Sequence, residues 1–316
     1  MSGWRGLGVF AAVIALLPWV VRNEYYVSVL VFVALNSMLA VGLTLLLGCA
    51  GQISLGHAAF YGLGAYTSGI LTVTYHWPIW PAMLVALVLV CAVAWLVGKP
   101  TLRLHGHYLA MATLGFGVIV NLILVQAIPL TGGPSGLIGI PSLTLGGLQL
   151  HTNLRFYFLA WTFTLATIIL ARNIVDSRVG RALRAIHGSE TAANMLGVNT
   201  PQYKLHIFVL SAALAAVAGS LRAHFVKFLS PEPFNWPTSI ALVVMVVIGG
   251  MGNVWGALLG AAAVTIVQEA LRAFRDYDIL VFGFLLIVAA MFFPGGLVGW
   301  AARRSRQRER KGAQVA

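Results

Sequence analysis

Side chains that could take part in chemistry are scarce in this sequence, and one group of them lies between residues 176 and 204. The stretch reads DSRVGRALRAIHGSETAANMLGVNTPQYK and lies between two long apolar runs. Its charged residues are Asp176, Arg178, Arg181, Arg184, Glu190 and Lys204. A folded polar segment in an otherwise apolar chain indicates a contact with something in the aqueous phase.

The stretch is predicted to form two short helices. Asp176 or Ser177 can cap the first helix, and Gly188 can end it. Ser189 can cap a second helix that runs from residue 190 to about residue 196, with Gly197 as its stop. In the first helix, one face is apolar and the opposite face carries the three arginines. The apolar face consists of Val179, Ala182, Leu183 and Ile186.

Part of this stretch resembles a known loop. Glu190-Thr-Ala192-Ala193 followed by Gly197 is similar to the EAA loop of ABC-importer membrane subunits. The longer string GRALRAI…E.AA..LGVNT..YKL…FVLSAALA..AGSL resembles the permeases of branched-chain amino acid importers, of the LivM type. With the segments 51–60 and 249–256, the resemblance spans most of residues 40–270. It implies an ATPase-coupling loop over residues 172–204 that includes Arg178, Gly180, Arg181, Glu190, Ala192, Ala193 and Gly197. The alternative is an ordinary amphipathic loop.

The same resemblance implies a set of partners. These are a second, LivH-like permease subunit, two cytoplasmic ABC ATPase subunits that use ATP, and a periplasmic or lipid-anchored substrate-binding protein. The implied substrates are branched-chain amino acids, although related importers carry other amino acids, urea or short amides. In such an assembly this chain forms half of the translocation path.

Motifs for catalysis are missing from the sequence. The phosphate-binding pattern GxxxxGK[ST] does not occur, because Gly98-Lys99 is followed by Pro100. HExxH, GxSxG and CxxC do not occur either. We therefore expect no catalytic residue, no cofactor site and no metal site, and we expect partner subunits to hydrolyse ATP.

A few polar residues lie within the apolar runs. Ser54 and His57 are three residues apart, and they either bond to backbone at a helix break or line a translocation path. Two of the apolar runs open with a glycine followed by a side-chain amide. These pairs are Gly51-Gln52 and Gly252-Asn253, so Asn253 is a second candidate for lining a translocation path. This pattern hints at an internal repeat of the kind that transporters use.

Buried acids are nearly absent from the apolar runs. Glu269 is the one candidate, and its position near Arg272 favours a salt bridge at headgroup level. Proton- or sodium-driven carriers generally need ionisable groups inside the membrane. The sequence therefore disfavours a secondary carrier, and the polar loop disfavours a membrane scaffold without transport activity.

The composition is that of an integral membrane protein. Of 316 residues, 59% are hydrophobic and 9% are charged, whereas soluble domains carry about 25% charged residues. We predict an all-α polytopic bundle of about ten spans that forms a single permease domain over residues 1–302. The apolar runs are 6–21, 27–47, 52–74, 79–98, 107–128, 155–171, 205–226, 237–251, 253–270 and 279–299. The breaks at 48–51 and 249–252 are tight turns or re-entrant elements.

The basic residues predict the topology. With both termini and residues 172–204 in the cytoplasm, 14 of the 20 lysines and arginines lie inside. Residues 129–155 then form an outer loop of turns or a short hairpin, and residues 303–316 form a basic cytoplasmic tail near anionic lipid. The positive-inside rule thus accounts for the net charge of +12 without nucleic acid. We expect a multi-pass protein of a bacterial or archaeal cell (inner) membrane.

Overall fold

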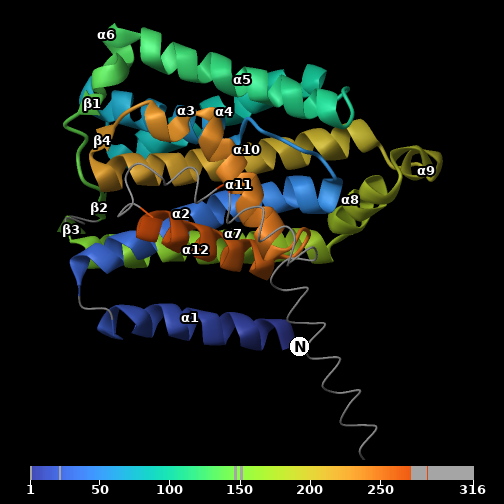
Figure 1. The fold of residues 1–316 in the computed structure, drawn as a ribbon, viewed down its shortest axis with the longest axis horizontal. Helices are drawn as coiled ribbons and strands as arrows, with labels where there is room; N and C mark the ends of the chain where they lie inside the picture. Colours follow the sequence, from blue (N-terminus) through green and yellow to red (C-terminus); the bar gives the residue numbers. More distant parts are fainter. Residues whose placement is uncertain (1, 21–22, 146–147, 150–151, 272–282, 284–316) are drawn as a thin grey trace, which may run out of the picture.

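The computed structural model describes residues 2–20, 23–145, 148–149, 152–271 and 283 of the chain. These residues form a bundle in which the long helices run roughly alongside one another (Figure 1). The long helices are α1 (Ser2–Val20), α2 (Glu24–Leu43), α3 (His57–Val73), α4 (Ile79–Thr101), α5 (His107–Gln126), α7 (Asn153–Asp176), α10 (Thr200–Val226), α11 (Trp236–Gly249) and α12 (Val254–Leu271). The all-α prediction is confirmed.

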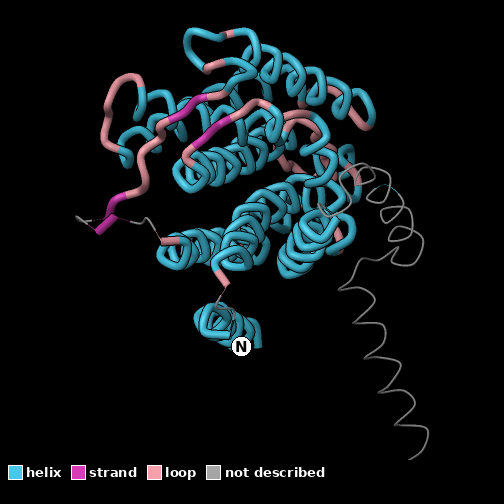
Figure 2. The backbone as a smooth tube through the Cα atoms, turned by 60° about the vertical axis from the view of Figure 1, so that its left-hand side comes forward, coloured by secondary structure: helices cyan, strands magenta, loops and turns pink. Residues whose placement is uncertain are grey.

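Shorter elements connect the long helices. They are the π-helix η1 (Thr44–Cys49), α6 (Ile128–Thr131), η2 (Gly133–Ser135), α8 (Arg178–Gly188), α9 (Glu190–Met195) and η3 (Glu232–Phe234), with the strands β1 (Leu137–Ile138), β2 (Thr144–Leu145), β3 (Leu148–Gln149) and β4 (Phe228–Leu229). Strand β1 pairs antiparallel with β4, and β2 pairs antiparallel with β3. Figure 2 shows these strand pairs as small additions to a helical bundle.

Each of the first nine predicted runs contains a long helix. Within the described residues, six helices are long and apolar enough to cross a membrane, while α11 has only 14 residues. The tenth run, 279–299, and the tail, 303–316, lie outside the described residues. The count of ten spans therefore stays a prediction.

The two ends of the bundle differ in character. The start of α1 lies at the same end as α8 and α9, whereas α6 and the four strands lie at the opposite end (Figure 1). Strands β2 and β3 form a small hairpin within the 129–155 loop, where the sequence predicted turns or a short hairpin, and α6, which was not predicted, precedes it at the same end. We refer below to the coupling-loop end, which carries α8 and α9, and to the hairpin end.

Burial divides the helices into central and peripheral ones. The segment formed by α2 and η1 is mostly buried, and α10 packs against α2, α3 and α4. Helices α4 and α5 instead expose large apolar side chains, including Leu84, Val88, Leu96, Met111 and Ile119. Hydrocarbon tails accept such surfaces and water does not. The exposed faces of α4 and α5 are therefore those expected of lipid-facing helices.

Two helix breaks lie against each other inside the bundle. Helix α2 continues as η1 to Cys49 and one further helical residue, residues 51–56 are non-helical, and α3 begins at His57. The second break is a tight turn at residues 250–253, where Gly250 and Gly252 have positive φ. A Cβ atom on Gly48 would overlap the backbone nitrogen of Gly252. The first break is therefore longer than the predicted 48–51, and the two backbones meet at glycine.

Glycines also allow close contact between helix backbones. A Cβ atom on Gly219 of α10 would overlap the carbonyl oxygen of Tyr61 on α3. On α12, Gly256 and Gly260 lie against the backbone of α11. Small residues serve this purpose in membrane bundles because dispersion contacts replace the hydrophobic effect between helices.

We expect Gly219→Ala to destabilise the bundle and Gly115→Ala to leave it unchanged or more stable. The added methyl group at position 219 meets backbone, which overpacks the interface by about 1–3 kcal/mol. Gly115 on α5 has open space around it, and alanine is the better helix former by roughly 1 kcal/mol. Thermal unfolding of the detergent-purified variants measures both effects. Equal melting temperatures for the two variants would contradict the packing argument.

Candidate functional site: a polar two-helix element beside a helix break

The turn from α7 into α8 is formed by local contacts. The Ser177 hydroxyl accepts hydrogen bonds from the backbone nitrogens of Val179 and Gly180 at 3.1 and 3.4 Å, which caps α8. A Cβ atom on Gly180 would overlap the carbonyl oxygens at the end of α7. The Arg184 side chain donates to the Val175 carbonyl at 2.9 Å. Gly180 therefore has a packing role, and α8 is fastened to the end of α7.

Helix α8 is amphipathic, largely as predicted. Leu183 and Ile186 are buried, whereas Arg178 and Arg181 are exposed. Val179 departs from the prediction, because its side chain is exposed although the helical wheel assigns it to the apolar face. The reason is its place in the first turn, where α8 has just left α7.

Helix α9 carries an apolar exposed tip. Ser189 caps the helix by accepting from the Ala192 nitrogen at 3.3 Å, and Gly197 ends the segment with φ of 82°. Met195 and Leu196 are 84% and 82% exposed. The predicted caps and stop are confirmed.

The two alanines of α9 face opposite environments. Ala192 is exposed, whereas Ala193 is only 1% exposed and packs inside the chain. A bulky residue at position 193 would therefore collide with the chain itself.

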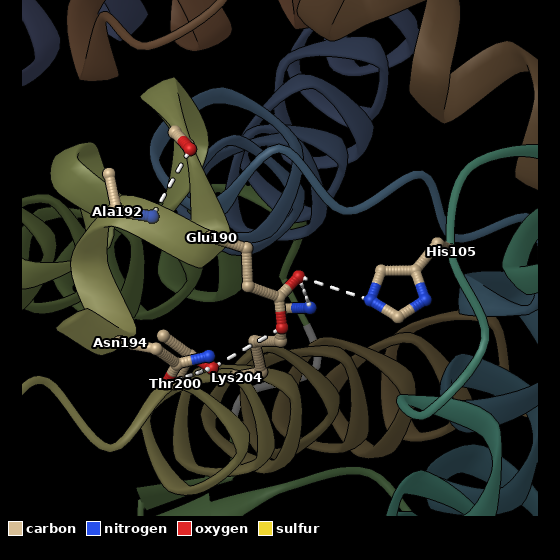
Figure 3. Close-up of polar contacts among 7 residues, drawn as sticks. His105, Glu190, Ala192, Asn194, Thr200 and Lys204 are labelled. Atoms are coloured by element: carbon tan, nitrogen blue, oxygen red, sulfur yellow. Dashed lines mark hydrogen bonds and ion pairs between the residues drawn. The ribbon is translucent and has the colours of Figure 1, made fainter.

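Glu190 is the centre of a polar network (Figure 3). Its carboxylate pairs with the Lys204 ammonium on α10 and accepts a 3.3 Å hydrogen bond from the Thr200 hydroxyl. The His105 Nε2 atom, in the connection between α4 and α5, lies 3.3 Å from Glu190 Oε2. Lys204 is buried, so the carboxylate is its compensating charge. Glu190 thus joins α9 to α10 and approaches the α4–α5 connection.

Three buried polar side chains are left without partners at the first helix break. Ser54 Oγ, His57 Nδ1 and both amide atoms of Gln52 form no hydrogen bond in the structure. The other ring nitrogen of His57 lies 2.8 Å from Ser211 Oγ on α10. Buried polar groups are normally satisfied, so each exception calls for an explanation. Sequence reasoning singled out Ser54 and His57 but missed Gln52.

The backbone at this break, in contrast, is bonded by other helices. Thr113 of α5 accepts from the Leu55 nitrogen, and Ser239 of α11 accepts from the Ala58 nitrogen, both at 3.0 Å. Asn253 has a different place, because its side-chain oxygen caps α12 by accepting from the Trp255 nitrogen at 3.0 Å and the Gly256 nitrogen at 3.4 Å. Helix capping accounts for Asn253 without a role in the path.

Helix α8 directly contacts the break. A Cβ atom on Gly51 would lie 3.4 Å from the imidazole ring of His187, near the end of α8. The polar element at the coupling-loop end and the unpartnered polar atoms at the break are therefore separated by only a few residues. No local sequence pattern signals this contact, since the two residues are 136 positions apart.

Other candidate groups have simpler explanations. The Tyr25 hydroxyl donates a hydrogen bond to Glu269 at the hairpin end, and the predicted partner Arg272 lies outside the described residues. Within the described part of the chain, no group of three or more His, Cys, Asp or Glu side chains is placed to hold a metal ion.

Comparison with known proteins assigns the sequence to a family. Residues 25–290 match the family described as "Branched-chain amino acid transport system / permease component". The chain is 33% identical over 284 residues to the permease protein LivM of the high-affinity branched-chain amino acid transport system of Escherichia coli (strain K12), covering 83% of this chain and 67% of that protein.

More distant relatives carry the same kind of name. The permease protein LivH of the same E. coli strain is 27% identical over 281 residues, and BraD of Pseudomonas aeruginosa is 27% identical over 283 residues. Each alignment covers 83% of this chain and 91% of the relative. No solved structure shows a significant match to the chain. From the extent of the family match and the similarity to LivM, the chain belongs to the permease components of branched-chain amino acid transport systems.

Proposed function

We propose that this chain is one of two membrane subunits of an ATP-driven, binding-protein-dependent importer of branched-chain amino acids. The observation that carries the proposal is the capped two-helix element α8–α9, which presents Met195 and Leu196 to water at one end of a membrane bundle. Exposed apolar patches with polar surroundings mark interaction sites. The second membrane subunit would be a LivH-like chain, and a periplasmic or lipid-anchored binding protein would deliver the substrate.

We infer that α9 docks on an ATPase subunit through its exposed tip. Ala192, Met195 and Leu196 provide a small apolar surface, and Arg178 and Arg181 provide positive charge on the exposed face of α8. The chain has no phosphate-binding loop, so ATP would be bound and hydrolysed by two cytoplasmic ATPase subunits. This chain would contribute mechanical coupling and no covalent chemistry.

Movement of α9 would be transmitted through three contacts. Glu190 links α9 to Lys204 on α10 and reaches His105 beside α4. The Arg184 hydrogen bond links α8 to α7. The His187 ring lies against Gly51, so α8 also presses on the break that precedes α3. A displacement of the element would therefore act on several helices at once.

The translocation path would include the helix break. Gln52, Ser54 and His57 offer polar atoms that lack a partner in this structure, and a polar cargo needs such atoms when it loses water. Interrupted helices supply substrate sites in many transporters. Asn253 stays outside this proposal because it caps α12.

The orientation follows from the distribution of charge. We place the coupling-loop end, which carries α8, α9 and the start of α1, in the cytoplasm, and the hairpin end outside the cell membrane. The basic tail and the C-terminus would then lie inside as well. Nothing in this arrangement calls for nucleic acid.

The proposed orientation predicts opposite labelling of two single cysteines. In a background lacking Cys49 and Cys91, Ile138→Cys at the exposed strand β1 should react with an impermeant thiol reagent added to intact cells. Arg103→Cys, in the exposed connection between α4 and α5, should react only after the membrane is permeabilised. Labelling of Arg103→Cys in intact cells would show the opposite orientation.

Docking through the α9 tip predicts that Leu196→Asp weakens association with the ATPase. Burying a leucine side chain contributes about 1.5–3 kcal/mol, and a carboxylate in its place would have to be desolvated. Leu104→Asp is the control, because Leu104 is an exposed apolar residue at the same end but outside α8 and α9. Co-purification of the ATPase from detergent-solubilised membranes measures the difference. Undiminished ATPase recovery with Leu196→Asp would remove this tip from the interface.

The buried pair predicts a non-additive response. Glu190→Gln leaves the buried Lys204 without its counterion and should destabilise the element by about 1–3 kcal/mol. Adding Lys204→Met should restore part of that loss, whereas His105→Gln should have little effect because His105 is 72% exposed. Thermal unfolding of Glu190→Gln, Lys204→Met, their double variant, His105→Gln and the parent protein measures the cycle. If the double variant is as unstable as the sum of the two single variants, the two residues are not coupled.

A further inference from the structure

Arg222 is a cation inside the bundle that the coupling role does not use. It lies on α10, about one turn before the helix ends at the hairpin end. Its guanidinium carbon lies 5.2 Å from the ring centre of Phe32 on α2 and 5.9 Å from the ring centres of Tyr61 on α3 and Phe234 on η3. Four elements thus meet at this side chain.

The side chain points into the bundle rather than to the nearer surface. Helical side chains lean toward the N-terminus of their helix, and the N-terminus of α10 lies at the coupling-loop end. Tyr61, which Arg222 contacts, is in the second turn of α3 and therefore closer to the helix break than to the hairpin end. Lys227 shows the contrast, because it caps α10 in the left-handed conformation and is exposed.

Arg222 has no ion pair with a carboxylate among the residues that the structure describes. Aromatic faces attract a cation, but they do not match the planar fork of donors with which a guanidinium binds a carboxylate. Charged residues within a membrane bundle are costly and generally functional. The side chain is partly exposed.

We propose that Arg222 binds the carboxylate of the transported amino acid as it enters from the hairpin end. The rings of Phe32 and Phe234 lie beside the guanidinium, where an aliphatic side chain would find apolar contact. Tyr61 and His57 are four residues apart on α3 and so share one helical face. That face leads from Arg222 to the unpartnered polar atoms at the break. The inference rests on the proposed import of amino acids and names the residue that recognises their shared charge.

The test uses the complete importer, with its ATPase subunits and binding protein, in proteoliposomes. The variants are Arg222→Gln, Arg222→Lys, the charge control Lys227→Asn at the same end of α10, and Phe32→Leu, which removes one ring from the cation. For each, the KM and maximal rate of leucine uptake are measured. Inhibition of uptake by leucinamide, which lacks the carboxylate, is measured beside ATPase activity and thermal unfolding of the complex.

We expect Arg222→Gln to raise the KM for leucine at least about tenfold, because a charge-assisted bidentate contact is lost. Arg222→Lys should raise it less, and Lys227→Asn should leave it unchanged. The parent importer should discriminate against leucinamide, and Arg222→Gln should lose part of that discrimination while its unfolding temperature stays within the range of the control.

Two results would overturn the inference while import itself stands. One is an unchanged KM and unchanged discrimination in Arg222→Gln. The other is a loss of uptake that parallels a loss of thermal stability, equally in Arg222→Gln and Phe32→Leu, which would assign Arg222 to packing alone. Failure of the parent importer to take up leucine would instead overturn the proposed function, and this inference with it.

Discussion

Inside a bilayer every backbone N–H and C=O group needs a partner within the protein, and this constraint governs the centre of the bundle. The chain breaks its helical hydrogen bonding over residues 51–56 and again at 250–253. Thr113 and Ser239 bond backbone nitrogens beside the first break, and Gly48 lets the second break approach it closely. Helices α2, α3, α5, α11 and α12 are therefore positioned by the requirement to satisfy one interrupted segment.

The polar element at the coupling-loop end, formed by α8 and α9, is anchored to the bundle through both of its helices. Ser177 and Arg184 hold α8 against the end of α7, and Glu190 holds α9 against the buried Lys204. The tip of α9 has no such anchoring contact with the described part of the bundle, and its Met195 and Leu196 side chains are exposed. A rigid base with an exposed apolar tip transmits a push more effectively than a flexible loop, which would absorb it.

Local features of this protein were predictable from its sequence, and contacts distant in sequence were not. The caps at Ser177 and Ser189 and the stop at Gly197 depend on neighbouring residues, so the pattern predicts them well. The contact between His105 and Glu190 and the ring contacts of Arg222 depend on how the helices pack, and a single sequence does not reveal that packing. The burial of Ala193 could not be predicted, because the six residues of α9 give too little periodicity to show which of its side chains face the bundle.

The π-helix from Thr44 to Cys49 contains extra backbone directly before the break that α8 contacts. A π-turn holds one residue more than an α-turn would in the same hydrogen-bonded loop. If its hydrogen bonds shifted to the α register, everything after it would turn by about 100° and advance by about 1.5 Å. Gln52 and Ser54 would then present different faces to the interior while α2 itself stayed in place. A one-residue change of register could thus replace a large helix movement as the step that opens the bundle.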